Sequence, residues 1–187
     1  MLEIRFDEFP VLTTQRLCLR RKTANDIGDI FLLRTNDEAM KYLDKPKFQT
    51  LEEASAFFQK TEDGIIHHDN ISWAITMKDE DRLIGDISFH RIDKTHHRAE
   101  IGYMLMPEHW RKGIVQEAVT AVIHYGFSVL NFHSIEAVIN PQNAASAALL
   151  EKNGFVREAY YKENYHYNGH FLDSAVYSLL KSNYNAS

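Results

Sequence analysis

The chain of 187 residues carries 26 acidic and 21 basic side chains, has a formal net charge of −5 and is 44% apolar. The acidic balance, and a sequence without a run of like charge or a basic stripe, disfavour nucleic-acid binding through phosphate neutralisation. No apolar stretch reaches membrane length and the N-terminus lacks a signal-peptide core, so we expect no membrane partner and a cytoplasmic location. The length and apolar content predict a single domain over residues 1–187 with a sizeable core.

The first 70 residues predict a strand followed by helices. Leu17 and Leu19 alternate with polar neighbours, which is typical of a strand. Residues 50–53 have the spacing of a helix capping box. The expected elements are a strand over 12–20 and helices over about 24–34, near 37–42 and from 51 to about 64.

From residue 71 the apolar period changes to two, which predicts three strands of an antiparallel meander. Further on, Gly154 is typical of a left-handed helix cap, and Asn168-Gly169 is a type I′ hairpin signal. The expected elements are strands 72–77, 82–90 and 98–106, a helix from 115, a strand 135–139, a helix 143–153, and strands 155–167 and 171–180.

A basic, glycine-bearing turn joins the strand that ends before Pro107 to the helix that follows. Proline removes a ladder donor and so ends the strand. Free backbone N–H groups at a helix start, beside Arg111 and Lys112, suit a phosphorylated ligand. Spacing alone leaves an ordinary solvated connection open. Apolar residues recur on one face of the expected helix at Val115, Val119, Val122, Gly126 and Val129.

The six residues Trp110-Arg111-Lys112-Gly113-Ile114-Val115 resemble the acyl-CoA pyrophosphate loop of the GNAT superfamily of N-acetyltransferases, usually Q/R-x-x-G-x-G/A. Gly113 matches, whereas Trp110 and Val115 replace the first residue and the small last one. Tryptophan at the first position is similar to the RimJ/RimL-like branch of ribosomal-protein N-terminal acetyltransferases, whose loop often reads W-G-K-G-Y-A-T-E-A. Residues 12–20 also resemble that branch's opening T-E-R-L-x-L-R.

This resemblance implies the GNAT fold, an α+β fold of three α/β/α layers around a mixed, mostly antiparallel sheet. The expected element order, β-α-α-β-β-β-α-β-α-β-β, agrees with it, and agreement between a local motif and the whole-chain order strengthens both. The resemblance also implies acetyl-CoA as cosubstrate, with no metal, and an amine as acceptor.

A second informative block begins at Asn140. On residue chemistry alone, Asn143 is a good N-cap for the helix that follows, and Ser146 lies in its first turn. The spacing N-x-x-N-x-x-S, followed by K-x-G-F, is similar to that of the RimJ/RimL-like branch. The resemblance implies that these three residues approach the pantetheine arm and sulfur of acetyl-CoA, and that Ser146 donates a proton to the departing thiolate.

Acetyl transfer from a thioester to an amine needs a neutral amine, a stabilised oxyanion and a protonated leaving thiolate. The resemblance places a backbone N–H for the oxyanion near Met104 or Leu105, where the strand splays from its neighbour. It implies Glu100 as a base acting through water, although a surface carboxylate beside Arg98 is the alternative. The residues that it assigns to acetyl-CoA are Met104, Leu105, Met106, Arg111, Lys112, Gly113, Ile114, Val115, Asn140, Asn143 and Ser146.

Other residues leave alternatives open. A tyrosine could replace Ser146 as proton donor, although cross-strand packing is the commoner reason for such a run. Asp173 is compatible with a structural turn bond or with a substrate contact. Adjacent histidines point to opposite faces of an extended chain, and the metal and G-x-S-x-G spacings are missing, so we expect neither a metal site nor a serine hydrolase. The tyrosines are Tyr160, Tyr161, Tyr165 and Tyr167.

We expect direct, ternary-complex acetyl transfer from acetyl-CoA to a primary amine, because no activated nucleophile is in evidence. An α-amino group is about one tenth neutral at pH 7, whereas a lysine is neutral in about one part in 2,500. A weak base therefore favours an N-terminal α-amine of a protein or peptide. The alternatives are a small-amine acetyltransferase, for polyamines or antibiotics, and a non-catalytic acyl-CoA-binding sensor. A monomer and a homodimer are both open.

Overall fold

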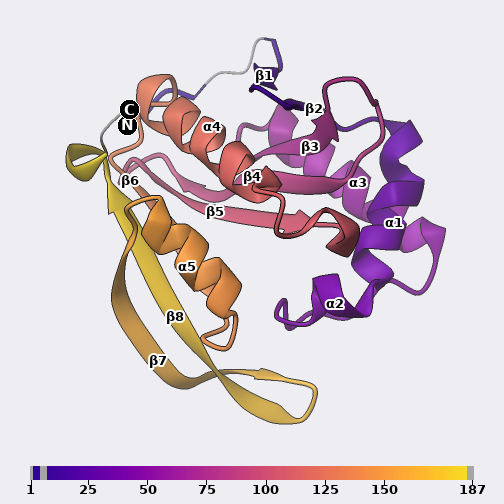
Figure 1. The fold of residues 1–187 in the computed structure, drawn as a ribbon. Coiled ribbons are helices and arrows are strands. Elements are labelled where there is room, and N and C mark those ends of the chain that lie inside the picture. The colour runs from indigo at the N-terminus through magenta and orange to yellow at the C-terminus, as the bar shows by residue number, and fades with distance from the viewer. Residues whose placement is uncertain (1, 5–7, 185–187) are drawn as a thin grey trace.

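The computed structural model describes residues 2–4 and 8–184, whose strands form one eight-stranded sheet with helices on both faces (Figure 1). The strand order is β1-β2-β3-β4-β5-β6-β8-β7, and the β5–β6 pair is parallel while the other neighbours are antiparallel. The expected three-layer α+β fold is confirmed. The strands are β1 (Leu12–Thr13), β2 (Leu17–Arg21), β3 (Ile71–Met77), β4 (Gly85–Asp93), β5 (Arg98–Leu105), β6 (Ser134–Ile139), β7 (Val156–Tyr167) and β8 (His170–Leu180).

Each face of the sheet packs a core of its own. Because successive strand residues point to opposite faces, β5 sends Ile101 and Leu105 into the core under α4 and α5, and Met104 into the core under α1–α3. The helices are α1 (Ile27–Thr35), α2 (Asp37–Met40), α3 (Leu51–Ile66), α4 (Ile114–Ser128) and α5 (Ala144–Lys152), with short 3-10 helices η1 (Ala24–Asp26), η2 (Pro107–His109) and η3 (Lys181–Asn183).

Two expected strands have wrong boundaries, and one residue expected on the apolar face of a helix is exposed. The strand over 12–20 is broken, because Thr14 turns the chain by donating its N–H to the Leu17 carbonyl (3.0 Å) and accepting the Leu17 N–H on Oγ1 (2.9 Å). The strand expected over 82–90 runs instead over β4, with a register shift near Arg91. Val129 is 58% exposed, because α4 ends one residue before it.

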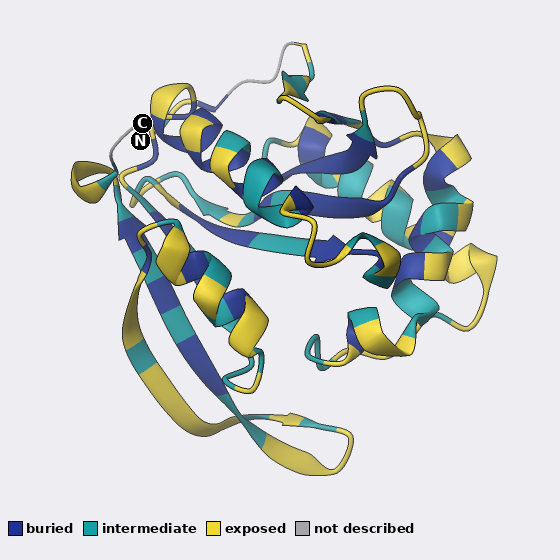
Figure 2. Cartoon of the chain, viewed as in Figure 1, coloured by how far each residue is buried: buried dark blue, intermediate teal, exposed yellow. Residues whose placement is uncertain are grey.

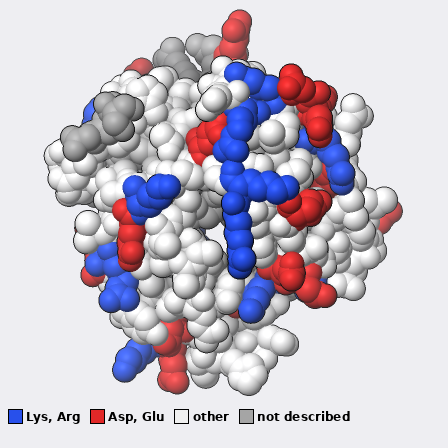
Figure 3. Space-filling view, in the orientation of Figure 1, with Lys and Arg blue, Asp and Glu red and all other residues white. Residues whose placement is uncertain are grey.

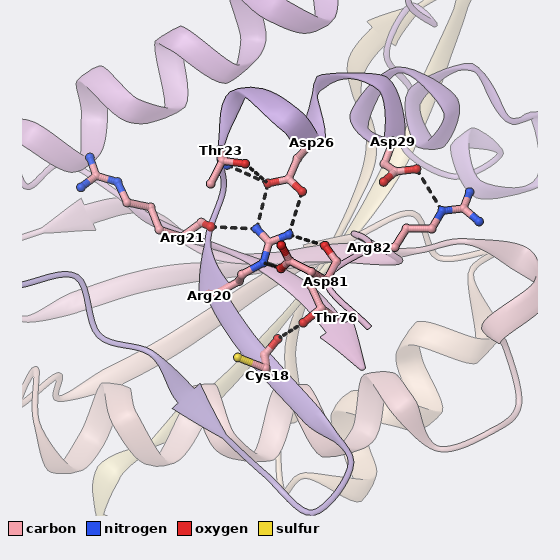
Figure 4. Close-up of polar contacts among 9 residues, drawn as sticks. All are labelled: Cys18, Arg20, Arg21, Thr23, Asp26, Asp29, Thr76, Asp81 and Arg82. Carbon is pink, nitrogen blue, oxygen red and sulfur yellow. Dashed lines mark hydrogen bonds and ion pairs between the residues drawn. The ribbon is translucent and has the colours of Figure 1, made fainter. Parts of the chain in front are cut away.

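Arg20 fastens the start of the α1–α3 layer to the sheet (Figure 4). Its guanidinium donates two 2.8 Å hydrogen bonds to the Asp26 carboxylate and a 2.6 Å bond to Asp81. The Thr23 N–H also donates to Asp26, which is 3% exposed. Burial raises the pKa of Asp26, but the hydrogen bonds from Arg20 and Thr23 outweigh it, and the pKa is lowered. The ionised pair thus fixes where α1 begins.

Strands β7 and β8 form a long hairpin that extends past α5 (Figure 2), where most of β7 is exposed. Its turn contains Asn168 and Gly169 at φ 48° and 82°, the left-handed values that a type I′ turn requires. Asp173 accepts hydrogen bonds from the Tyr160 hydroxyl (2.5 Å) and the Glu163 N–H (2.8 Å) within this hairpin. The contacts of Asp173 are therefore those of a structural bond.

The sheet opens between β5 and β6. The two strands pair only at Arg98–Ser134, Ala99–Ile135 and Glu100–Glu136. Beyond Glu100, β5 continues beside β4 and β6 continues beside β8. The strands therefore part earlier than Met104, and the opening lies between the two helical layers.

Candidate active site

The loop before α4 presents a run of unused backbone donors. Arg111 and Gly113 adopt left-handed φ values of 58° and 74°, which turn the chain into the helix. Among the described residues, the N–H groups of residues 111–116 have no hydrogen-bond acceptor. Such groups at a helix N-terminus attract anions through hydrogen bonds and the helix dipole. The loop has the backbone chemistry of a phosphate site.

Arg16 adds a third cation to this loop, beside Arg111 and Lys112. Its Nη1 donates to the Lys112 carbonyl (2.8 Å) and its Nε to Glu117 (2.7 Å). A Cβ placed on Gly113 would lie 3.4 Å from Arg16 Nη2. Figure 3 shows a stripe of Lys and Arg side chains over the region where Figure 1 has the start of α4. Sequence reasoning missed Arg16, because 96 positions separate it from Lys112.

Trp110 ties the loop to the end of β5. Its indole Nε1 donates to the Leu105 carbonyl at 2.8 Å, which gives the unusual first residue of the loop a structural role. Ile114 is 3% exposed and belongs to the core under α4 and α5, and the partly buried Val115 packs against the same core. Their side chains therefore anchor α4, and only their N–H groups are left for a ligand.

The backbone phase of β5 decides which N–H groups face the opening. Met106 donates its N–H to the Ile84 carbonyl (2.8 Å), on the β4 side. Since backbone donors alternate along a strand that pairs without interruption, Met104 also directs its N–H to β4. Leu105 and Tyr103 direct theirs to the opposite side, toward the opening. Of the two expected oxyanion donors, only Leu105 has the right orientation.

Ser146, which is buried, and Tyr103, which is half-buried, form a hydroxyl pair on the α4–α5 side of the sheet. Their oxygens are 2.7 Å apart. Ser146 is 7% exposed, and the Asn143 side chain accepts its N–H at 3.1 Å, as the capping spacing predicts. Burial raises the pKa of Tyr103 to about 12, so the phenol stays protonated at neutral pH. Sequence reasoning missed Tyr103, which lies 43 positions from Ser146.

Asn140 makes contacts toward the α1–α3 side. Its Nδ2 donates to Asp44 at 3.1 Å, its Oδ1 accepts the Gln142 N–H at 2.9 Å, and Asp44 also accepts the Tyr165 hydroxyl at 2.5 Å. The loop after α2 is thus linked to β7 across the mouth of the opening. Within the described residues, Asn143 is hydrogen-bonded to Ser146, whereas Asn140 is not.

Glu100 lies on the opposite face of β5 from Tyr103. It is 8% exposed and accepts from Arg91 (2.8 Å), with His90 at 3.2 Å. Burial raises the pKa of Glu100, but the contacts with His90 and Arg91 outweigh it, and the pKa is lowered. A cleft of about 280 Å³ beside it is lined by Arg91, Asp93, Arg98, Ala99, Glu100 and Glu136.

In the part of the chain that the structure describes, neither a metal-binding cluster nor a membrane-spanning helix is found. Residues 2–4 and 8–184 hold no cluster of three or more His, Cys, Asp or Glu side chains that suits a metal ion. In the same ranges, no helix has the length and apolar character to span a bilayer.

Comparison with known proteins gives the class of this chain. Residues 16–156 match the family model of the acetyltransferase (GNAT) domain. The chain therefore belongs to the GNAT acetyltransferase family and is an acetyl-CoA-dependent N-acetyltransferase.

Its relatives differ in the acceptor that their names state. The chain is 39% identical over 173 residues to the N-acetyltransferase YoaA of Bacillus subtilis strain 168, covering 92% of this chain and 98% of YoaA. A spermidine N-acetyltransferase of Vibrio cholerae, solved with CoA and spermine, superposes with a TM-score of 0.81 at 26% identity, covering 91% and 99%. RimL, a ribosomal L7/L12 α-N-protein acetyltransferase solved with CoA, gives 0.82 at 22% identity, covering 91% and 98%. The likeness to RimL concerns the fold.

Proposed function

We propose that the chain transfers the acetyl group of acetyl-CoA to the N-terminal α-amine of a protein or peptide. The observation that carries the cosubstrate site is the run of unused N–H groups at residues 111–116, placed beside the opening between β5 and β6. Arg111 and Lys112 belong to that run, and Arg16 donates to the Lys112 carbonyl. A diphosphate bound there directs the thioester into the opening.

Three groups around the opening serve the three steps of transfer. The Leu105 N–H donates to the oxyanion that forms at the thioester carbonyl, a kind of contact worth about 3–4 kcal/mol in other enzymes. On the α4–α5 side, Ser146 donates its hydroxyl proton to the departing thiolate while it stays hydrogen-bonded to Tyr103. On the other side, Glu100 accepts the proton of the attacking amine through water. Glu100 then releases to water the proton that it has taken from the amine, and Ser146 is reprotonated from water.

The low pKa of Glu100 supports an α-amine as acceptor. A carboxylate stabilised by Arg91 and His90 is a weak base, and a weak base suffices only when much of the amine is already neutral. An α-amine with a pKa near 8 meets this condition at pH 7 to 8, whereas a lysine-like amine near 10.4 does not.

Spermidine is the second candidate acceptor, and its support comes from the relatives. Spermidine N(1)-acetyltransferase of Vibrio cholerae is 28% identical over 171 residues, covering 90% of this chain. The amines of a polyamine have lysine-like pKa values, so this acceptor requires a stronger base or a higher pH.

Release of free coenzyme A thiol from acetyl-CoA tests the proposal. We expect saturable release with short peptides that have a free N-terminus and none with the same peptides blocked at the N-terminus. Faster release with spermidine than with every peptide would favour the second candidate. Tight acetyl-CoA binding without release across both groups of amines would identify an acyl-CoA sensor.

A further inference from the structure

Arg16, in the turn between β1 and β2, is hydrogen-bonded both to α4 and to the loop before it. Its backbone N–H and its Nε donate to the two carboxylate oxygens of Glu117, at 2.8 and 2.7 Å. Its Nη1 donates to the Lys112 carbonyl at 2.8 Å. Glu117 lies in the first turn of α4. One guanidinium therefore joins the start of this helix to the loop that supplies the unused N–H groups.

The carbonyl that Arg16 holds belongs to the peptide between Lys112 and Gly113. None of the described residues has a cis peptide bond, and in a trans peptide the C=O and the N–H point in opposite directions. The Arg16 hydrogen bond therefore directs the Gly113 N–H away from the β1–β2 turn, to the side where no protein group accepts it. A Cβ placed on Gly113 would lie 3.4 Å from Nη2, so the guanidinium lies alongside this peptide.

The backbone of this loop needs such a restraint. Arg111 has a φ of 58°, a left-handed value that costs about 1–2 kcal/mol for a residue with a side chain. Strained residues persist only where the surrounding structure fixes them. The Trp110 indole fixes one end of the loop through the Leu105 carbonyl. Arg16 fixes the other end through the Lys112 carbonyl.

Glu117 makes the charge of Arg16 important as well. Its side chain is 19% exposed. Burial raises the pKa of Glu117, but the hydrogen bonds from Thr14 and Arg16 outweigh it, and the pKa is lowered. An ionised carboxylate in the first turn of α4 repels an anion bound at the N-terminus of the same helix. The ion pair with Arg16 offsets this repulsion.

We propose that Arg16 is a positioning residue for acetyl-CoA, which holds the Gly113 N–H toward the diphosphate by binding the Lys112 carbonyl. This inference rests on the proposed function, because it takes the diphosphate to bind at this loop. Arginine suits the role, since its planar fork makes several hydrogen bonds in fixed directions, whereas a lysine ammonium is a compact point charge. The β1–β2 turn thereby becomes part of the cosubstrate site.

A pair of thioesters tests the role by calorimetric titration without any acceptor amine. Acetyl-pantetheine, measured by displacement, lacks the diphosphate of acetyl-CoA, so the ratio of the two affinities reports on the diphosphate alone. Arg16→Gln should lower this ratio by about tenfold to a hundredfold, the range of a charge-assisted hydrogen bond. Arg16→Lys keeps the charge without the fork and should lower it by at least tenfold. An unchanged ratio in either variant overturns the proposal.

Arg21→Gln is the matched control. Arg21 forms an ion pair with Glu62 at 2.7 Å and its side chain is 44% exposed, compared with 2.7 Å and 41% for Arg16 and Glu117. Its partner belongs to α3, in the other helical layer. The control should therefore keep the full ratio. A drop equal to that of Arg16→Gln would show a general effect of charge and overturn the positioning role.

Hydrogen exchange separates this inference from the proposed function. Coupling between two sites is reciprocal, so saturating acetyl-CoA should slow exchange of the Arg16 N–H, which is bonded to Glu117. Acetyl-pantetheine should have no such effect. Slower exchange and a lowered ratio without thiol release to any amine would contradict the proposed function and support the role of Arg16. Thiol release to peptides with an unchanged ratio in Arg16→Gln would support the function and overturn that role.

Discussion

Gly113 combines a backbone requirement with an electrostatic one. Its φ of 74° is strained for residues with a side chain, and its N–H is one of the unused donors. Gly113→Asp should place a carboxylate beside the bound diphosphate. Like charges about 4 Å apart cost about 4 kcal/mol at an effective dielectric constant of 20, so acetyl-CoA affinity should fall by about three orders of magnitude.

The asparagine variant isolates the charge. Asn has nearly the shape of Asp and tolerates left-handed φ, so Gly113→Asn should weaken acetyl-CoA binding by only about tenfold. Titration calorimetry on both variants measures the difference. Equal acetyl-CoA affinities of Gly113→Asp and the unmodified protein would show that the diphosphate does not bind at this loop.

Ser146 and Tyr103 act, in our proposal, as one proton-donating pair. Ser146→Ala should lower kcat by about a hundredfold, the lower range for acid catalysis, with little change in KM for acetyl-CoA. Tyr103→Phe should reduce kcat in the same direction by a smaller factor, since the serine hydroxyl remains. Steady-state kinetics with one peptide acceptor give both values. Parallel losses in kcat and in acetyl-CoA affinity would show that Ser146 binds acetyl-CoA and does not donate the proton.

At the scale of elements, the Arg20–Asp26 pair holds α1 on the sheet and makes stability depend on pH. The hydrogen bonds from Arg20 and Thr23 hold the folded-state pKa of Asp26 below its usual value of 3.8. Its contribution is therefore complete above about pH 4 and is lost as the pH falls through the lower folded-state pKa. The free energy of unfolding, measured with urea between pH 2 and 7, should fall at the acid end.

Asp26→Asn is the comparison for this prediction. It should destabilise the protein at pH 7 by about 2 kcal/mol, because it breaks charge-assisted hydrogen bonds of a buried group. Its acid slope should be shallower than that of the unmodified protein. Identical slopes would assign the acid sensitivity to other carboxylates.

The elements themselves were largely predictable, and the site was predictable only in part. Gly113, Asn143 and Ser146 carry local signals, a glycine in a basic turn and a helix cap. Tyr103 and Arg16 carry none, because their contacts join segments that lie far apart in the sequence. The boundaries near Thr14 and Arg91 failed for a similar reason, since a side-chain hydrogen bond and a bulge interrupt the period of two.

At the scale of the whole molecule, Asp44 connects the α1–α3 layer to the β7–β8 hairpin through Asn140 and Tyr165. Tyr165→Phe removes one of these hydrogen bonds. The KM for the acceptor should rise about threefold to tenfold, because the loop loses a hydrogen bond worth about 1 kcal/mol that restrains it. The affinity for acetyl-CoA, which binds on the other face, should be unchanged. Hydrogen exchange in residues 41–50 should become faster. Unaltered exchange there would show that Asp44 does not restrain the loop.

The parting of β5 and β6 after Glu100 has a consequence for how acceptor choice can change. In the function that we propose, the donor and the acceptor reach the reacting atoms from opposite sides of one sheet, and separate helices line each approach. Substitutions in α1, α2 and the loop that follows can therefore change which recipient is preferred without changing the affinity for the donor. Exchanging that segment between relatives should transfer recipient preference as a module.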